Sequence, residues 1–373
     1  MTKIYRPSLV EVDLSVIGHN YRQVEKIVGP KVKILAAVKA HAYGHGLIEI
    51  SRFLEKLGVE FLGVASIDEG IELRENGIGC KILVLGSVLR DNCQDAIENN
   101  LTLTVCTRDL LWQLDKLGRE MHKAIPVQLK IDTGMGRIGM WHKEAVDFIQ
   151  EAASFANIKL EGLYTHFPSA ETDPEFTREQ LKIFNSIVEE LKPGIKFDYL
   201  HSANSMGILG YKDSHFNLVR PGLILYGIYP DEKIRNLFSF KPALTLKSKV
   251  VFLKKVPEGR GISYGHTYKT SSSVNIATVA IGYADGYPRA LSNCSEVLIK
   301  GKRHKVIGAV CMDKIMVEIK DDAVELEDEV VLIGKQKDEI IRVEELAQHA
   351  GTIAYEIITG LSSRLPRIYK SVG

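Results

Sequence analysis

The sequence predicts an α/β protein with two parts, an N-terminal (β/α)8 barrel (TIM barrel) and a C-terminal, mainly antiparallel β-domain. First, eight short β-rich runs alternate with helix-like segments between residues 34 and 222. Second, from about residue 240 the helical periodicity gives way to alternating β-branched residues. Third, 373 residues are too many for one ordinary core. We therefore expect domains at 1–240 and 241–373, and leave open that the first ten or so residues pair with the second domain.

The barrel prediction rests on where the β-rich runs lie and on which residues end them. The runs are residues 34–39, 61–66, 81–86, 101–106, 126–132, 159–166, 197–204 and 216–222. Amphipathic, helix-like segments separate most of these runs, as at 143–155 and 177–191. In such barrels the chemistry lies at the carboxyl ends of the strands, so the polar residues there should converge. These residues are Lys39, Lys130, Asp132, His166, Asn204, Ser205 and Arg220.

The second part of the chain has the alternation that is typical of an antiparallel sheet. Its β-rich runs are residues 244–256, 274–283, 296–300, 305–320 and 329–333. Short turns separate the runs, and one helix-like segment, 343–349, precedes the closing stretch 355–369.

Composition indicates a globular protein with a small-molecule partner. The chain is 45% hydrophobic and 25% charged, and its formal net charge of +1 provides no strong field for nucleic acid or a membrane. We find no apolar leader-like segment near the N-terminus and no stretch long enough to cross a bilayer. The five cysteines are scattered and lack a Cys-x-x-Cys spacing. We therefore expect a cytoplasmic protein with reduced thiols.

Lys39 ends the first apolar run and is followed by a turn rich in glycine. Taken alone, a lysine at this place is best explained as a strand end whose ammonium reaches water. The alternative is a lysine in a pocket, where burial lowers the pKa and makes the amine a nucleophile that forms a Schiff base with a carbonyl. The surrounding chain decides between these interpretations.

Residues 134–139 match the pattern G-x-G-x-x-G and follow a strand, but the context of a dinucleotide site is missing. We expect these glycines to bring backbone close to a ligand, with Arg137 and Lys130 projecting over it. His41 and His45 have a spacing of four, but the glycines around them argue against a helix and no acid completes a ligand set. We predict no catalytic metal.

Two turns near the end of the barrel pattern are suited to a phosphate. Asn204 and Ser205 follow the seventh run, and Gly222 and Leu223 follow the eighth, where barrels commonly bind this group. A capping serine and a turn glycine would be the plainer explanation of either turn alone. With a strand-end lysine they favour pyridoxal 5′-phosphate (PLP), and Arg220 could then donate to the pyridine nitrogen and leave the ring neutral.

Nine motifs are spread along nearly the whole chain, namely AVKAHAYGHG, LKIDTGMGRIG, YTHF, HSANS, RPGLILYG, ISYGHTY, IGYADGY, GAVCMD and YEIITGLSSRLPRIY. With these motifs the chain resembles the alanine racemase family, which is PLP-dependent and combines a barrel with a β-domain. A chance match to all nine in the same order is implausible.

The resemblance implies roles for individual residues. Lys39 resembles the Schiff-base lysine, which also acts as the base for D-alanine, and Tyr264 resembles the base for L-alanine. In the family this tyrosine comes from the second subunit of a head-to-tail homodimer, so that each site is shared. The implied cofactor contacts are Tyr43, His166, Asn204, Ser205, Arg220, Gly222, Leu223 and Tyr355. The implied substrate contacts are Arg137, Met312, Asp313, Tyr283 and Lys130, which matches a lysine that the family often carbamylates.

The resemblance also implies the function, a racemase that interconverts L- and D-alanine and supplies D-alanine for peptidoglycan. Three positions depart from the family pattern around the substrate entrance, namely Ala309, His266 and Glu171. Alternatives are a racemase for serine or a larger amino acid, a PLP-binding homeostasis protein, and a PLP-dependent decarboxylase. Tyr355 narrows the pocket toward alanine, Tyr264 and the second domain argue against the homeostasis protein, and Arg220 argues against the decarboxylase.

Overall fold

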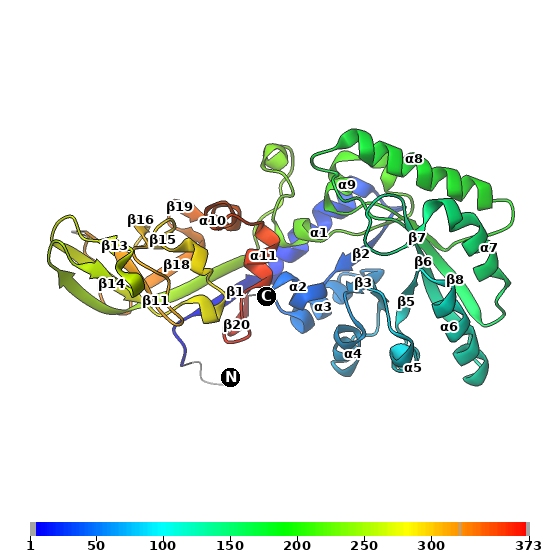
Figure 1. Cartoon of the computed structure of the whole chain (residues 1–373), viewed down its shortest axis with the longest axis horizontal. Coiled ribbons are helices and arrows are strands. Elements are labelled where there is room, and N and C mark those ends of the chain that lie inside the picture. Colours follow the sequence, from blue (N-terminus) through cyan, green and yellow to red (C-terminus); the bar gives the residue numbers. More distant parts are fainter. Residues whose placement is uncertain (1–4, 321, 371–373) are drawn as a thin grey trace.

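The computed structural model describes residues 5–320 and 322–370 and contains two bodies that share one hydrophobic core. Figure 1 shows the barrel at the right and the β-domain at the left, with helix α11 (Ala354–Thr359) between them. The sequence prediction of the fold class is confirmed, because parallel strands with helices form the first body and a mainly antiparallel sheet forms the second.

The barrel is a parallel sheet whose strands follow one another in the order β10-β2-β3-β4-β5-β6-β8-β9. Backbone bonds from Asn217 N–H to the Leu200 carbonyl (3.4 Å) and from Arg220 N–H to the Ala203 carbonyl (3.0 Å) bring its two edges together. Short strand β7 (Met140–Trp141) pairs with β6. The barrel strands are β2 (Lys33–Ala37), β3 (Phe61–Val64), β4 (Lys81–Val84), β5 (Thr102–Val105), β6 (Ile125–Asp132), β8 (Ile158–Tyr164), β9 (Tyr199–His201) and β10 (Leu218–Val219).

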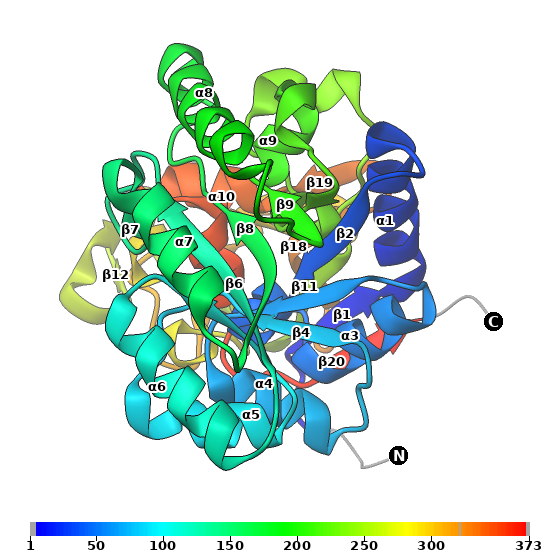
Figure 2. The same ribbon diagram turned by 90° about the vertical axis from the view of Figure 1, so that its right-hand side faces the viewer.

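Helices surround these strands, as the end-on view in Figure 2 shows. Each packs an apolar stripe onto the sheet; in α6, for example, Leu110, Leu114 and Leu117 are buried at helical spacing. Capping side chains fix the starts of several helices, such as Asp173 before α8, whose carboxylate accepts the Phe176 N–H at 3.0 Å. The helices are α1 (Leu14–Val28), α3 (Leu47–Lys56), α4 (Ile67–Glu75), α5 (Cys93–Glu98), α6 (Arg108–Glu120), α7 (Ala145–Ser154), α8 (Pro174–Leu191) and α9 (Ser205–Gly210).

The second body is built around the long strand β11 (Leu244–Val256). Strand β1 (Leu9–Asp13) pairs antiparallel with β11 and parallel with β20 (Arg367–Lys370), so residues 9–13 belong to this sheet. A small hairpin of β12 (Gly261–Ile262) and β13 (Tyr268–Lys269) projects from it. The remaining elements are β14 (Val274–Val279), β15 (Glu296–Ile299), β16 (Lys302–Lys305), β17 (Ile315–Glu318), β18 (Glu329–Gln336), β19 (Glu339–Ile341) and helix α10 (Val343–Ala350).

Several β-rich runs are shorter as strands than the sequence pattern predicts. The run 305–320 contains the last residue of β16, an isolated bridge at Val306 and β17, because residues 307–314 form a loop that carries Met312 and Asp313. The run 216–222 contains only β10; Pro221 has no N–H to donate to a ladder. The closing stretch 355–369, to which the sequence pattern assigned no structure, falls on α11 and β20. Within the described ranges, no helix has the length and apolar character needed to span a bilayer.

Candidate active site

Lys39 lies at the barrel mouth, at the start of a backbone turn of unusual hand. It follows the end of β2, and the next residues, Ala40 to Tyr43, all have φ between 52° and 57°. This left-handed conformation costs residues other than glycine roughly 1–2 kcal/mol each, so surrounding bonds must hold it. Gly44 ends the turn at φ 79°, where a Cβ atom would lie 2.0 Å from the Ile358 carbonyl oxygen of α11. The sequence prediction of Lys39 as the last strand residue is therefore wrong by two residues, since β2 ends at Ala37.

Five basic side chains gather around the barrel mouth. Burial lowers the pKa of the Lys39 amine, and Arg137 and Arg220 lower it further, while the Glu69 carboxylate acts in the opposite direction. Lys130, at the end of β6, is only 3% exposed, and burial together with Arg137 and Arg220 lowers its pKa to about 7. Such a cluster favours an anionic ligand. Its members are Lys39, Lys130, Arg137, His166 and Arg220.

Arg220 is buried and is held on several sides by acceptors. Its Nη2 donates to the Thr165 carbonyl at 2.7 Å and the Ser202 carbonyl at 3.0 Å, and lies 3.3 Å from Nδ1 of His166. Its Nη1 lies 2.6 Å from Nδ1 of His201. Burial, followed by the charge of Arg220, lowers the pKa of both histidines well below the usual value, so both rings are neutral acceptors.

The ring of Tyr164 forms a floor beneath two of these cations. The guanidinium carbon of Arg220 lies 5.2 Å from the ring centroid and Nζ of Lys130 lies 5.4 Å from it. The Tyr164 hydroxyl pairs with that of Thr104 at 2.7 Å. These residues were not predicted from the sequence. Tyr164 belongs to the YTHF motif, where attention to strand ends selected only His166.

Next to this cluster lies a group of hydroxyls and backbone amides that we call the cup, formed by Tyr43, Ser205, Gly222, Leu223 and Tyr355. The Gly222 N–H donates to Oγ of Ser205 at 3.0 Å, and a Cβ atom on Gly222 would lie 2.6 Å from the Tyr43 hydroxyl. The Tyr43 and Tyr355 rings have centroids 6.1 Å apart. Asn204 caps α9, since its Oδ1 accepts the Gly207 N–H at 2.9 Å. Leu223 follows Gly222 and begins a short 3-10 helix, Leu223–Tyr226.

The cup and the basic cluster together fit PLP. Hydroxyls and backbone N–H groups suit a phosphate, and the close approach of Gly222 to Tyr43 requires glycine at that position. Arg220 keeps its positive charge at neutral pH, because burial lowers its pKa only to about 10. It can therefore donate to a ring nitrogen but cannot protonate it fully. Among the described residues, no group of three His, Cys, Asp or Glu side chains is arranged to hold a metal ion.

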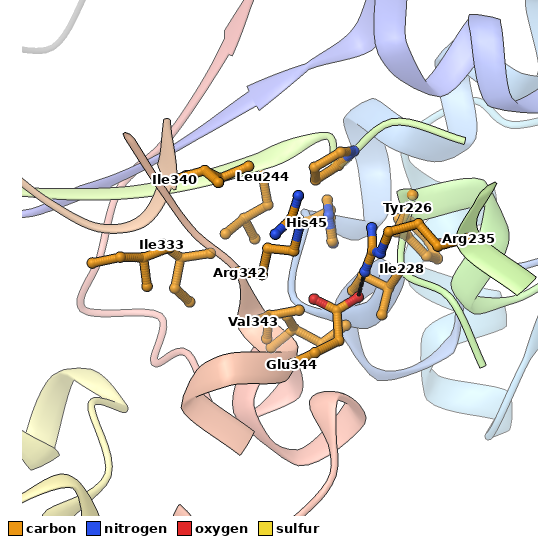
Figure 3. A pocket seen from close by; sticks show the side chains of 15 residues that line it. His45, Tyr226, Ile228, Arg235, Leu244, Ile333, Ile340, Arg342, Val343 and Glu344 are labelled. Atoms are coloured by element: carbon orange, nitrogen blue, oxygen red, sulfur yellow. Dashed lines mark hydrogen bonds and ion pairs between the residues drawn. The ribbon is translucent and has the colours of Figure 1, made fainter. Parts of the chain in front are cut away.

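Tyr43 stacks on Tyr226 with ring centroids 5.0 Å apart, and the His45 ring also packs against Tyr226, with centroids 4.5 Å apart. Figure 3 shows the small cavity of about 30 Å³ that His45 and Tyr226 line together with Val343 and other residues at the domain junction. An ion pair of Arg235 with Glu344 at 2.8 Å borders it. This packing joins the phosphate cup to the second domain. Burial lowers the pKa of His45 to about 4, so this ring is neutral as well.

Four predicted site residues of the second domain do not join this cluster within one chain. Tyr264 is 74% exposed in the loop between β12 and β13, and within the described ranges no hydrogen bond or ring contact joins it to the barrel. Tyr283 and Met312 are also exposed, at 43% and 53%. Asp313 forms an ion pair with Arg364 at 2.6 Å, which lowers the pKa of its carboxyl.

The three positions that depart from the family pattern also have defined surroundings. Ala309 is buried, and its carbonyl accepts a hydrogen bond from the Ser263 hydroxyl at 2.6 Å. His266 is exposed in the same loop as Tyr264. Burial raises the pKa of Glu171; burial also raises the pKa of Tyr355, with smaller contributions in the same direction from Tyr43 and Glu171. Glu171 therefore lies near the mouth of the cup.

A barrel with a strand-end lysine, a cup for phosphate and an arginine for a ring nitrogen defines a PLP enzyme. Residues 12–230 match the family described as alanine racemase, N-terminal domain, and residues 243–369 match alanine racemase, C-terminal domain. The chain belongs to the alanine racemase family, and the resemblance inferred from the nine motifs is confirmed. Enzymes of this family depend on PLP and interconvert L- and D-alanine.

Individual relatives cover nearly the whole chain. An alanine racemase from Halothermothrix orenii is 44% identical over 372 residues, which are 99% of this chain and 98% of the relative. The structure of alanine racemase from Clostridium difficile 630 aligns with a TM-score of 0.94 at 38% identity, covering 99% of this chain and 97% of that one. The Bacillus anthracis alanine racemase with bound L-Ala-P has a TM-score of 0.92 at 39% identity, with coverages of 99% and 96%.

Proposed function

We propose that this chain is a PLP-dependent alanine racemase whose active site combines the barrel mouth of one subunit with the β-domain loops of a second. The observation that carries the proposal is the division of the predicted residues. Lys39 and the predicted cofactor contacts of the barrel lie near one another at its mouth, whereas Tyr264 is exposed on the other domain. A head-to-tail homodimer, with domains divided at about residue 240, would complete each site.

The residues of the cup would hold the phosphate, and Lys39 would hold the aldehyde carbon of the cofactor. Tyr43, Ser205 and Tyr355 offer hydroxyls, while Gly222 and Leu223 offer backbone N–H groups and Asn204 orders the loop between them. PLP, when bound to an amino acid, delocalises negative charge from Cα and so makes the α-proton removable. Arg220 would donate a hydrogen bond to the ring nitrogen, and His166 and His201 would keep it in place.

Two bases on opposite sides of the substrate would exchange its α-proton. The amine of Lys39 is poised to accept a proton from D-alanine, because burial and two arginines favour its neutral form. Tyr264 of the partner subunit would act on L-alanine. An ordinary phenol has a pKa of about 10, so a phenol base needs cations nearby. The chain from Arg220 to His166 could provide this environment.

The alanine carboxylate would bind to Arg137 and to the Met312 backbone of the partner subunit, with Asp313 and Tyr283 along the approach. Lys130 would carry a carbamate that holds Arg137. A buried amine with a pKa of about 7 is largely neutral at physiological pH, which is the form that reacts with CO2. A carbamate would also supply negative charge to the cluster of five basic side chains.

We infer a cytoplasmic enzyme that supplies D-alanine for peptidoglycan. Scattered cysteines support this location, since all five are free thiols in the structure. The prediction that Tyr355 narrows the pocket supports alanine over a larger amino acid, and this ring lies near the proposed phosphate contacts, with its centroid 6.1 Å from that of Tyr43. Serine differs from alanine by a hydroxyl only and is the substrate that must be tested beside it.

Proton NMR of the protein with PLP and L-alanine in D2O, followed by chiral analysis, tests the reaction. We expect deuterium at Cα and a product that approaches equal amounts of both enantiomers. Bound PLP without exchange would favour a carrier protein, and exchange without inversion would remove Tyr264 from its role. Tyr264→Phe should lower turnover in both directions but leave the absorbance of bound PLP unchanged.

Mixed subunits test the shared site. We expect Lys39→Ala and Tyr264→Phe proteins to be inactive when separate and to regain up to about a quarter of parental activity after refolding together, because half of the dimers are hybrids with one intact site. If both residues served one site from the same chain, mixing would restore nothing. The oligomeric state is measured in parallel by sedimentation.

A further inference from the structure

Glu69 binds two backbone amides at the mouth of the barrel. Its Oε1 accepts the N–H of Ala40 at 2.7 Å and its Oε2 accepts the N–H of Ala65 at 2.7 Å. Ala40 is the residue after Lys39, and Ala65 is the residue after β3. One carboxylate therefore joins the ends of two neighbouring barrel strands.

The geometry around this carboxylate is well defined. Strands β2 and β3 pair in parallel, with Ala37 opposite Gly63, and Val38 N–H continues the ladder to the Gly63 carbonyl at 2.9 Å. The bond to Glu69 therefore begins where the ladder ends. Glu69 itself is anchored at the start of α4, where its N–H donates to the Ser66 hydroxyl at 3.4 Å. The carboxylate is thus fixed from its own helix before it reaches across to Ala40.

The hydrogen bond from Ala40 to Glu69 falls where the backbone conformation is unfavourable. Ala40 is the first of the four left-handed residues that follow Lys39, with φ 52° and ψ 54°. A charged acceptor on its amide is a strong form of hydrogen bond and offsets part of the cost of this conformation. Any movement of Ala40 would move Lys39, to which it is bonded.

We propose that Glu69 is a positioning residue for Lys39, because its carboxylate fastens the Ala40 amide to the Ala65 amide and so holds the left-handed turn that carries the amine. The role of this amine rests on the proposed function. The charge of Glu69 also acts on Lys39, in the direction opposite to the charges of Arg137 and Arg220.

Hydrogen exchange on the full-length, PLP-loaded protein tests directly whether Glu69 holds the turn after Lys39. We expect amides in residues 38–47 to exchange about tenfold faster in Glu69→Ala, and to a smaller extent in the isosteric Glu69→Gln. Glu75→Gln is the matched control, because it removes the same charge from an exposed position at the end of α4. Faster exchange confined to residues 66–76, or no faster exchange in any segment, would overturn the proposal. Either result would mean that Glu69 stabilises at most the start of its own helix and not the turn after Lys39.

A pH profile gives a second readout that a structural role alone would not move. Without the Glu69 carboxylate the amine of Lys39 loses its opposing charge, so its pKa falls further. The Lys39 amine is free only after the substrate has displaced it from PLP, so its pKa governs the acid limb of kcat. This limb of kcat for D-alanine should therefore move to lower pH in Glu69→Gln and stay in place in Glu75→Gln. An unmoved limb would contradict the charge effect. Amide hydrogen exchange can be measured whether or not the protein racemises alanine. Failure of the proposed function can therefore be distinguished from failure of the role proposed for Glu69.

Discussion

Arg220 and His201 are joined by a hydrogen bond of 2.6 Å in which the guanidinium Nη1 donates to the imidazole Nδ1. The other ring nitrogen of His201 lies 2.8 Å from Oε1 of Gln128, to which it donates. The histidine is therefore held as the neutral tautomer with hydrogen on Nε2. A neutral acceptor lets Arg220 remain the charged group of the pair.

Arg220→Lys should destabilise the protein by about 1–3 kcal/mol, although the charge is kept. A single ammonium cannot reach His201, the Thr165 carbonyl and the Ser202 carbonyl together, so buried acceptors lose their partner. Urea unfolding measures the difference. Arg178→Lys, on the exposed side of α8, is the control and should change stability by less than about 0.5 kcal/mol. Equal midpoints for the two variants would show that the network around Arg220 contributes nothing.

Gly222→Ala should weaken PLP binding by about tenfold and cost about 1–3 kcal/mol of stability. The new methyl group would meet the Tyr43 hydroxyl at 2.6 Å, in a place where both residues are buried. Removing that oxygen in Gly222→Ala with Tyr43→Phe should recover part of the stability. Gly194→Ala, where the added atom meets nothing within 4 Å, is the control. Cofactor titration and thermal unfolding report the two effects, and a loss in the double variant equal to the sum of both single losses would argue against this contact.

Lys130 should take up a carbamate at about pH 8 and lose it as the pH falls through about 7, because only the neutral amine reacts with CO2. Carbon NMR with labelled bicarbonate detects the group. The signal should be absent from Lys130→Met and unchanged in Lys182→Met, a lysine exposed on α8. A signal that persists in Lys130→Met would assign the carbamate to a different amine.

The same amine gives stability a pH dependence when CO2 is removed. In the folded protein Lys130 releases its proton near pH 7, whereas in the unfolded chain a lysine keeps it to about pH 10.4. Between these values the unfolded state binds more protons, so the free energy of unfolding rises with pH. Lys130→Met should flatten this rise and should be more stable than the parent below about pH 7. Urea unfolding across this range measures the slope, and identical slopes would show that Lys130 is not the titrating group.

The fold class and the convergence of strand-end residues were accessible from sequence, because period and strand ends are local patterns. The backbone conformation after Lys39 could not be predicted from the sequence. Nothing in Ala-His-Ala-Tyr indicates four successive positive φ angles, since none of these residues prefers them. Bonds from distant segments impose that turn, among them the one from Glu69.

The partners of Arg220 illustrate a second limit. His201 ends β9 in the motif that supplied Asn204 and Ser205, so the strand-end rule could have selected it. Gln128 lies inside β6, and a single polar residue within an apolar run does not indicate which partner it will have. Only the assembled barrel brings it to His201. Tyr264 shows a third limit, because the residues that would surround it belong to a second copy of the chain.

Strand β1 lies between β11 and β20, so the first and last described strands are neighbours in one sheet. During synthesis, all residues of the barrel leave the ribosome before β20 does. Until then, the edge of β1 that pairs with β20 stays unpaired. An unpaired edge invites pairing with other chains. The barrel can therefore form early, while the sheet that includes β1 is completed only once β20 has been made.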